Sequence, residues 1–200
     1  MPHDSSRGAA RTAGRKRADA ERSVAAIVTA ATGCFARDRD ASMSDIAKAA
    51  GVSRVTLYAH FSSREELLRR VLAESVAEGS ADIAATSPAE GPPAQAFAHL
   101  IRSAWPILSR SGSLHAAAQH VLPAEEVREF HDEPMAAVRL LIARGQADGS
   151  FRGDLPLEWV VTTVYSLLHA AVDEVADGRF LPDEAGAILE KTLLAVLRPG

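Results

Sequence analysis

The sequence predicts an all-α protein with a small N-terminal domain and a larger C-terminal helical domain. Apolar residues recur at the i, i+3, i+4 spacing of amphipathic helices over most of the chain. We find no sustained alternation of apolar and polar residues, the pattern typical of strands, and no internal repeat. Beyond residue 78 the composition changes, and the proline- and glycine-rich stretch at 87–93 indicates a loop. We therefore predict one domain over residues 19–78 and another over 79–200.

Helix boundaries follow from the apolar spacing and from turn residues. The first long helix is expected over 19–37, where an apolar stripe includes Val24, Ile27 and Phe35. Pro106 is expected to kink one later helix, and Pro134 to interrupt another or to start part of it. The C-terminal helices are expected at 94–110, 114–122, 124–146, 156–177 and 183–197.

Residues 42–67 carry the signals of a helix-turn-helix. A short helix is expected to start at Ser44, which is a good N-cap residue, and to end at Gly51, where glycine tolerates the left-handed backbone. Ser53 is expected to cap a second short helix over 54–61. Such a pair of helices can place its second member in the major groove of DNA.

The second short helix has an inner and an outer face. Leu57 and Phe61 lie four residues apart and are expected to be buried. The opposite face has a small apolar centre, Val55 and Ala59, which can approach a thymine methyl group. Its flanks carry donors that can reach phosphates, namely Arg54 and Tyr58 on one side and Thr56 and His60 on the other.

A third helix is expected to start at a capping box formed by Ser62 and Glu65. Its N-terminus offers free backbone N–H groups and the positive end of the helix dipole, which suit a phosphate. Arg64 would reinforce that site. An apolar stripe then continues through Leu67, Leu68, Val71, Leu72 and Val76.

The run from Ala50 to Leu68, with its Gly-Val-Ser turn, its Thr-Leu-Tyr-x-His-Phe helix and its basic-Glu-Glu-Leu-Leu start, resembles the TetR family of bacterial transcriptional regulators. The resemblance covers about Ala20 to Leu72. It implies base contacts from Arg54 and Val55. It further implies phosphate contacts from Thr56, Tyr58, His60 and Arg64, with Tyr58 sometimes contacting bases too. Ser42 and Ser44 lie where the family also contacts the DNA backbone or an outer base. The family usually has lysine where this chain has Arg64, so the charge is kept. The alternative is an ordinary helical hairpin, in which Tyr58 packs in the core and His60 is solvated.

The same resemblance implies the role of the C-terminal domain. It predicts a homodimer formed through the last two helices, a palindromic operator, and release from DNA by a small organic effector. Apolar pockets with a few polar anchors are typical of such ligands, and we expect Trp105, His120 and Tyr165 to line this one. Tyr165, His169 and Asp173 are spaced four residues apart and are expected to form a polar stripe at the dimer interface.

Charge is distributed unevenly along the chain. Residues 1–70 hold 13 Lys and Arg against 8 Asp and Glu, whereas residues 71–200 hold 9 against 18. The resulting charges of +5 and −9 put the basic half at the helix-turn-helix, which favours double-stranded DNA as a partner. Residues 1–18 are expected to form a disordered basic arm, which fits either a contact with the DNA backbone or a solvated tail.

Several other classes of site and location are not indicated. Cys34 has no partner for an intramolecular disulfide, which fits a reducing cytoplasm. His115 and His120 lie five apart without evident further ligands, so no metal site is expected, and no cofactor motif is found. No apolar run reaches the 18 residues of a membrane span, and we expect a cytoplasmic protein.

A ligand-responsive, dimeric DNA-binding repressor, without enzymatic activity, is therefore the main functional prediction. One alternative is an all-α enzyme with a pocket around His169 and Asp173. It predicts turnover and leaves the pattern from Arg54 to Arg64 unexplained. A second alternative is a DNA-organising protein with the same N-terminal domain and no effector, which would bind many sequences with similar affinity.

Overall fold

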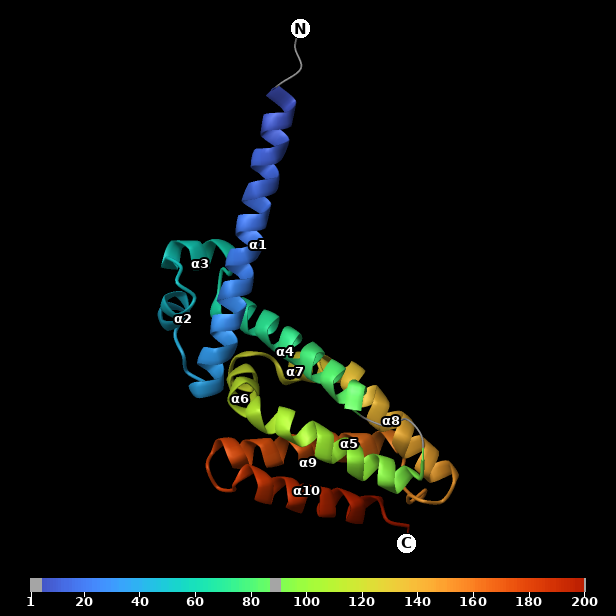
Figure 1. Ribbon diagram of the computed structural model, residues 1–200. Coiled ribbons are helices and arrows are strands. Elements are labelled where there is room, and N and C mark those ends of the chain that lie inside the picture. The colour runs from blue at the N-terminus through green and yellow to red at the C-terminus, as the bar shows by residue number, and fades with distance from the viewer. Residues whose placement is uncertain (1–4, 87–90, 200) are drawn as a thin grey trace. The chain divides into compact units, whose positions relative to one another are not determined.

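The computed structural model describes residues 5–86 and 91–199. Over these residues the regular secondary structure is helical, with no β-strand, as the sequence predicted (Figure 1). The helices are α1 (Ser5–Arg37), α2 (Met43–Ala49), α3 (Arg54–His60), α4 (Arg64–Thr86), α5 (Pro93–Arg110), α6 (Gly112–Val121), α7 (Ala124–Glu129), α8 (Asp132–Ala147), α9 (Leu157–Ala176) and α10 (Pro182–Leu197).

The chain divides into two compact units, Met1–Val71 and Leu72–Gly200. The division falls inside α4, earlier than the boundary region of 78–92 that the sequence indicated. The reason is that α4 continues as one helix to Thr86, and Leu72 packs with Ala118 and its neighbours in the second unit. Residues 87–90 of the predicted loop lie outside the described part of the chain.

The first unit forms around the C-terminal half of α1. Ile27 and Phe35 of this helix are fully buried, as are Ile46 of α2 and Leu57 of α3. Helix α1 begins at Ser5, so the segment expected to be a disordered arm is helical from that residue. Its composition accounts for the difference, because alanine, arginine and lysine are among the best helix formers. The first four residues of that arm lie outside the described chain.

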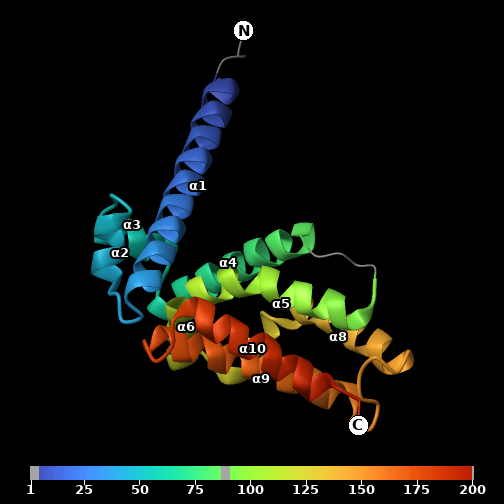
Figure 2. The same ribbon diagram turned by 60° about the horizontal axis from the view of Figure 1, so that its bottom comes forward.

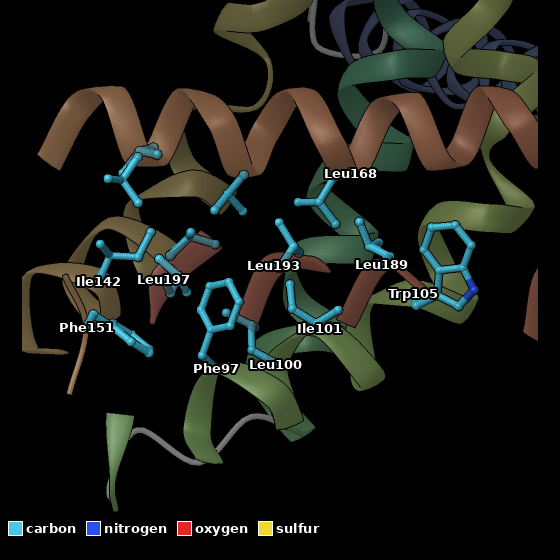
Figure 3. Packing of buried hydrophobic residues seen from close by; sticks show 14 of the residues in the cluster. Phe97, Leu100, Ile101, Trp105, Ile142, Phe151, Leu168, Leu189, Leu193 and Leu197 are labelled. Atoms are coloured by element: carbon cyan, nitrogen blue, oxygen red, sulfur yellow. The ribbon is translucent and has the colours of Figure 1, made fainter. Parts of the chain in front are cut away.

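The second unit is built around the antiparallel pair α9 and α10, which lie side by side in both views (Figures 1 and 2). Helix α5 packs against α10, α8 and α9, and α6 packs against α9. Phe97 of α5, Ile142 of α8 and Leu193 of α10 are fully buried in the shared core (Figure 3). Val164 of α9 is fully buried in the same core. Each such side chain contributes about 1.5–3 kcal/mol through burial of apolar surface.

Close approach of α5 and α10 depends on a glycine. A Cβ atom added at Gly186 would lie 2.5 Å from Cδ1 of Trp105. The indole nitrogen of Trp105 donates a hydrogen bond to the carbonyl of Pro182, 2.7 Å away. Trp105 therefore lies in the interface between these two helices.

The segment expected as one helix over 124–146 is two helices. The break lies at Phe130 and His131, and His131 becomes the N-cap of α8. Pro134 lies in the first turn of α8, where a missing backbone N–H is tolerated, whereas α5 continues through Pro106. The break matters for the site described below because it brings His131 to the start of a helix. Among the described helices, none has the length and apolar character needed to cross a membrane.

Candidate nucleic-acid interface and sensor cavity

Helix α2 begins with a capping box. The backbone N–H of Asp45 donates to Ser42 Oγ at 3.2 Å, and the N–H of Ser42 donates to Asp45 Oδ2 at 3.3 Å. The Ser42 hydroxyl also donates to Asp45 Oδ2, at 2.5 Å, and this hydrogen bond, followed by that from the Ser42 N–H, lowers the pKa of Asp45. The N-cap is therefore Ser42 and not Ser44 as predicted. Ser44 lies within the first turn and is half-buried.

The turn between α2 and α3 has the predicted glycine. Gly51 adopts φ +68°, the left-handed conformation that costs glycine little and other residues more. Ser53 then caps α3, because its Oγ accepts the backbone N–H of Thr56 at 3.0 Å. This cap, and the start of α3 at Arg54, agree with the sequence prediction.

Helix α3 has the two faces that its sequence predicted. Leu57 is fully buried and Phe61 is 6% exposed. On the opposite side Val55 is 80% exposed and Tyr58 is 46% exposed, and Arg54 is also exposed. Thr56 and His60 are half-buried at the flanks. The helix thus presents a continuous outer face to solvent while its inner face anchors it.

The cap of α4 is shifted by one residue from the predicted Ser62–Glu65 pair. Ser63 Oγ accepts the backbone N–H of Glu66 at 3.2 Å. The Glu66 carboxylate accepts both the backbone N–H and the hydroxyl of Ser62, each at 2.7 Å. The pattern of serines and glutamates fits either register, and the helix selects the one that starts at Arg64.

Arg64 is tied to the protein itself. Its guanidinium lies over the ring of Phe35, 5.3 Å from the centroid. It also donates hydrogen bonds to the backbone carbonyls of Ala41, at 3.5 Å, and Arg39. Arg64 therefore holds the connection between α1 and α2 against the start of α4, a structural role that its predicted phosphate contact did not include.

The second unit contains an apolar cavity of about 240 Å³ between α4, α5, α8 and α9. Leu100, Ala104, Val138 and Leu168 contribute apolar walls, and His131 and His169 add polar groups. A smaller cavity of about 80 Å³ shares both histidines and extends to His115 of α6.

Three histidines meet at these cavities, and we call His115, His131 and His169 the histidine cluster. One ring nitrogen of each lies within 4.8 Å of those of the other two. His115 and His169 stack at 4.2 Å between ring centroids, and His131 lies edge-on to both, at 5.4 and 4.9 Å. Tyr165 continues the stack beyond His169, at 4.1 Å.

Each ring of the cluster has a defined hydrogen-bonding state. Nδ1 of His131 lies 2.8 Å from the carbonyl of Val127, and Nδ1 of His169 lies 2.8 Å from the carbonyl of Tyr165. Nε2 of His115 is buried and has no hydrogen-bond partner among the residues that the structure describes. Burial lowers the pKa of His115 to about 3 and that of His169 to about 4, and it also lowers the pKa of His131. All three imidazoles are consequently neutral near pH 7.

Comparisons with known proteins agree with this geometry. Residues 27–71, which include α2, α3 and the start of α4, match the family model described as bacterial regulatory proteins, tetR family. The match to this family covers that N-terminal segment of the chain. The helix-turn-helix of this segment is accordingly of the type found in DNA-binding transcriptional regulators of that family. No curated protein sequence matches the chain.

Solved structures of TetR-type regulators share the fold of both units. The fatty acid degradation regulator FadR of Bacillus halodurans is 21% identical, with a TM-score of 0.71 over 86% of this chain and 94% of that one. FadR of Bacillus subtilis, solved with stearoyl-CoA, is 17% identical, with a TM-score of 0.70 over 86% and 98%. LfrR of Mycobacterium smegmatis, solved with proflavine, is 23% identical, with a TM-score of 0.67 over 88% and 97%.

The three residues expected to line an effector pocket lie in different places. Trp105 is 6% exposed and packs against α10, and His120 is exposed on α6, so neither borders the two cavities above. Tyr165 stacks on His169 and lies under the Arg128 guanidinium, at 5.3 Å. The expected role of Trp105 and His120 in an effector pocket therefore stays a prediction. Helix spacing alone did not show that Trp105 packs against Gly186.

The structure also changes the expected position of the polar stripe on α9. Tyr165 and His169 contact rings of α6 and of the α7–α8 break inside the unit, rather than an outer face of α9. His131 was missed by the sequence analysis. His131 reaches His115 and His169 because the helix breaks there and because α6 packs against α9. The spacing of these residues along the chain does not predict that contact.

Proposed function

We propose that this protein is a homodimeric repressor of the TetR family, that it binds a palindromic operator, and that a small organic effector releases it. The observation that carries the proposal is the outer face of α3. Arg54, Val55 and Tyr58 are exposed on a short helix whose opposite side is anchored by Leu57. A helix capped and anchored in this way can enter a major groove without unfolding.

The residues on that face have different proposed roles. Arg54 and Val55 read base edges, through the guanidinium and through contact with a thymine methyl group. Thr56, Tyr58 and His60 bind phosphates at the walls of the groove, and Ser42 and Ser44 approach the DNA backbone from α2. Arg64 contributes positive charge there while it holds α1, as its contacts with Phe35 and two carbonyls indicate.

Dimerisation through α9 and α10 is supported by their outer surfaces. Trp159 is 62% exposed, Leu181 72% and Ile188 46%. An apolar groove of about 160 Å³ runs between the two helices, with Leu167 and Ile188 in its lining. A second copy that packs its own α9 and α10 here would bury these side chains symmetrically. Ile188→Asp should then shift the mass measured by light scattering from dimer to monomer.

The cavity between α4, α5, α8 and α9 supports an effector of mainly apolar character. Its walls are mainly aliphatic, with His131, His169, Glu133 and Ser80 as polar members, which is the usual composition of a small-molecule site. Two TetR-type neighbours are described with bound organic molecules, stearoyl-CoA and proflavine. Helix α4 lines the cavity through Ser80 and Ile83 and begins at Arg64 in the first unit, so a ligand that shifts α4 also acts on the DNA-binding unit.

The deciding experiment measures binding of the full chain to the DNA that flanks its own gene, across a salt series, with a scrambled duplex as competitor. We expect sequence-selective binding whose affinity falls steeply with salt, because phosphate contacts release counterions. Equal affinity for every duplex would favour the DNA-organising alternative. A folded dimer that binds no DNA would overturn the proposal and return attention to an enzyme around His169 and Asp173.

A further inference from the structure

We propose that His115, His131 and His169 form a binding site for one divalent transition-metal ion of the zinc type. The ligands come from α6, from the α7–α8 break and from α9, within one unit. This inference is independent of operator binding, since it concerns only the second unit. It goes beyond an organic effector because three imidazoles select a different class of ligand.

The orientation of two rings is already that of metal ligands. A histidine that coordinates a metal through one nitrogen donates its other N–H to a carbonyl or carboxylate, which fixes the tautomer. His131 and His169 do this with Nδ1 and the carbonyls of Val127 and Tyr165, each at 2.8 Å. The free lone pair of both rings is therefore on Nε2.

The third ring provides the clearest sign of a missing partner. His115 is 5% exposed, and its buried Nε2 has no hydrogen-bond partner in the described chain. Leaving a buried polar nitrogen unsatisfied costs about 1–3 kcal/mol. If the cluster served only for packing, an apolar ring at this position would avoid that cost. A metal ion satisfies the nitrogen.

The distances permit an ion after a small adjustment. The ring nitrogens lie within 4.8 Å of one another. Tetrahedral coordination at about 2.0–2.1 Å per bond requires nitrogens about 3.3–3.4 Å apart. Rotation of the rings can close this gap, because the cavities on both sides of His131 and His169 leave room for the movement.

The donor set defines the class of ion and leaves one position open. Neutral imidazole suits Zn²⁺, Co²⁺ and Ni²⁺, whereas Mg²⁺ and Ca²⁺ prefer oxygen ligands. With three protein ligands, the fourth position is available to water or to a ligand in the cavity. An anionic group there, such as hydroxide or a carboxylate, would offset the charge of an ion in these largely apolar surroundings.

Metal binding is tested on the full-length chain after dialysis against a chelator. Zn²⁺ should raise the midpoint of thermal unfolding with a stoichiometry of one ion per chain, because a ligand that binds only the folded state stabilises it. Mg²⁺ at the same concentration should leave the midpoint unchanged. Co²⁺ should give the visible absorption bands of a four-coordinate nitrogen site, without the intense sulfur charge-transfer band that Cys34 would produce.

The matched variants are His115→Phe and His120→Gln. Phenylalanine keeps an aromatic ring in the stack but removes the metal ligand, so the variant should still fold without metal. It should bind Zn²⁺ at least about 100-fold more weakly than wild type, because the loss of a mere hydrogen-bond partner of a metal ligand can already weaken binding by that factor. His120, exposed on the same helix, should be replaceable without effect. His169→Gln provides a second ligand deletion, checked by circular dichroism.

The proposal fails if the wild-type chain shows neither a Zn²⁺-dependent midpoint nor Co²⁺ bands. It also fails if His115→Phe binds as tightly as wild type, which would mean that the cluster is a packing motif, or if His120→Gln abolishes binding. The wild-type measurements decide the question even if a ligand variant does not fold.

Discussion

The imidazole of His115 stacks on that of His169, with 4.2 Å between ring centroids and 37° between ring planes. One ring belongs to α6 and the other to α9, so the stack joins two helices that are distant in the sequence. Both rings border the smaller cavity. The polar part of the candidate sensor site is therefore assembled by packing between helices, while the face proposed to read DNA is built from one short segment.

Neighbouring residues of α3 should respond in opposite ways to truncation. Tyr58→Ala removes a side chain that is 46% exposed and should weaken DNA binding with little change in thermal unfolding. Leu57→Ala empties a fully buried position and should lower the free energy of unfolding of the DNA-binding unit by about 2–5 kcal/mol. Fluorescence anisotropy with labelled DNA and calorimetry separate the two effects. Full DNA affinity in the Tyr58 variant would contradict the proposed groove placement.

Arg54→Ala should relax base preference at one operator position. A guanidinium that binds a guanine edge contributes about 1–3 kcal/mol of discrimination, so selectivity there should fall about 5- to 150-fold. Binding to a panel of single-base operator variants measures this. Arg110→Ala, which removes a similar exposed charge from the second unit, is the control. A uniform loss across the panel would assign Arg54 to a phosphate instead.

Arg64→Ala should lower both stability and DNA affinity. The substitution removes the contact with the Phe35 ring and the hydrogen bonds to the carbonyls of Ala41 and Arg39. We expect a loss of about 1–3 kcal/mol in unfolding free energy, the range for hydrogen bonds made by charged groups. Arg64→Lys should restore the charge but only part of the stability. If Arg64→Ala left the unfolding midpoint unchanged and reduced the slope of log affinity against log salt concentration by about one, Arg64 would make only a phosphate contact.

Gly186→Ala should separate α10 from α5. The new Cβ would lie 2.5 Å from Cδ1 of Trp105, and the indole is held by its hydrogen bond to Pro182. Overpacking of this kind typically costs about 1–3 kcal/mol, which chemical denaturation will report. Gly153→Ala, where the added Cβ meets nothing within 4 Å, is the matched control. Equal stability of both variants would show that the α5–α10 contact adapts without cost.

Filling the larger cavity should block effector response without affecting DNA binding. Ala104 lines this cavity and is 7% exposed, so Ala104→Phe directs a ring into it. Any compound that releases the wild-type protein from its operator should fail to release the variant, while operator affinity without effector stays within about threefold, or about 0.65 kcal/mol. Release of the variant at the same effector concentration would place the effector elsewhere.

The DNA-binding unit was largely predictable because its signals are local. The left-handed turn at Gly51, the Ser53 cap and the burial of Leu57 each depend on residues within a few positions of one another. The caps of α2 and α4 were predicted to within one or two residues, because nearby serines offer equivalent caps to those at Ser42 and Ser63. The larger difference in this unit is the start of α1, which lies at Ser5 and not at residue 19. The contacts of Arg64 were not predictable in this way, because the carbonyls of Ala41 and Arg39 that accept its hydrogen bonds lie more than twenty residues away in the sequence.

In the second unit, by contrast, the sequence by itself determined only helices and an excess of apolar surface. Periodicity shows which face of a helix is apolar, but it does not show which neighbour that face meets. Tertiary packing alone decided that Trp105 lies against Gly186, that the helix break brings His131 to the cavity, and that His115 and His169 stack there. These are long-range contacts set by the shape and volume of several helices together, and no short segment of the chain encodes them.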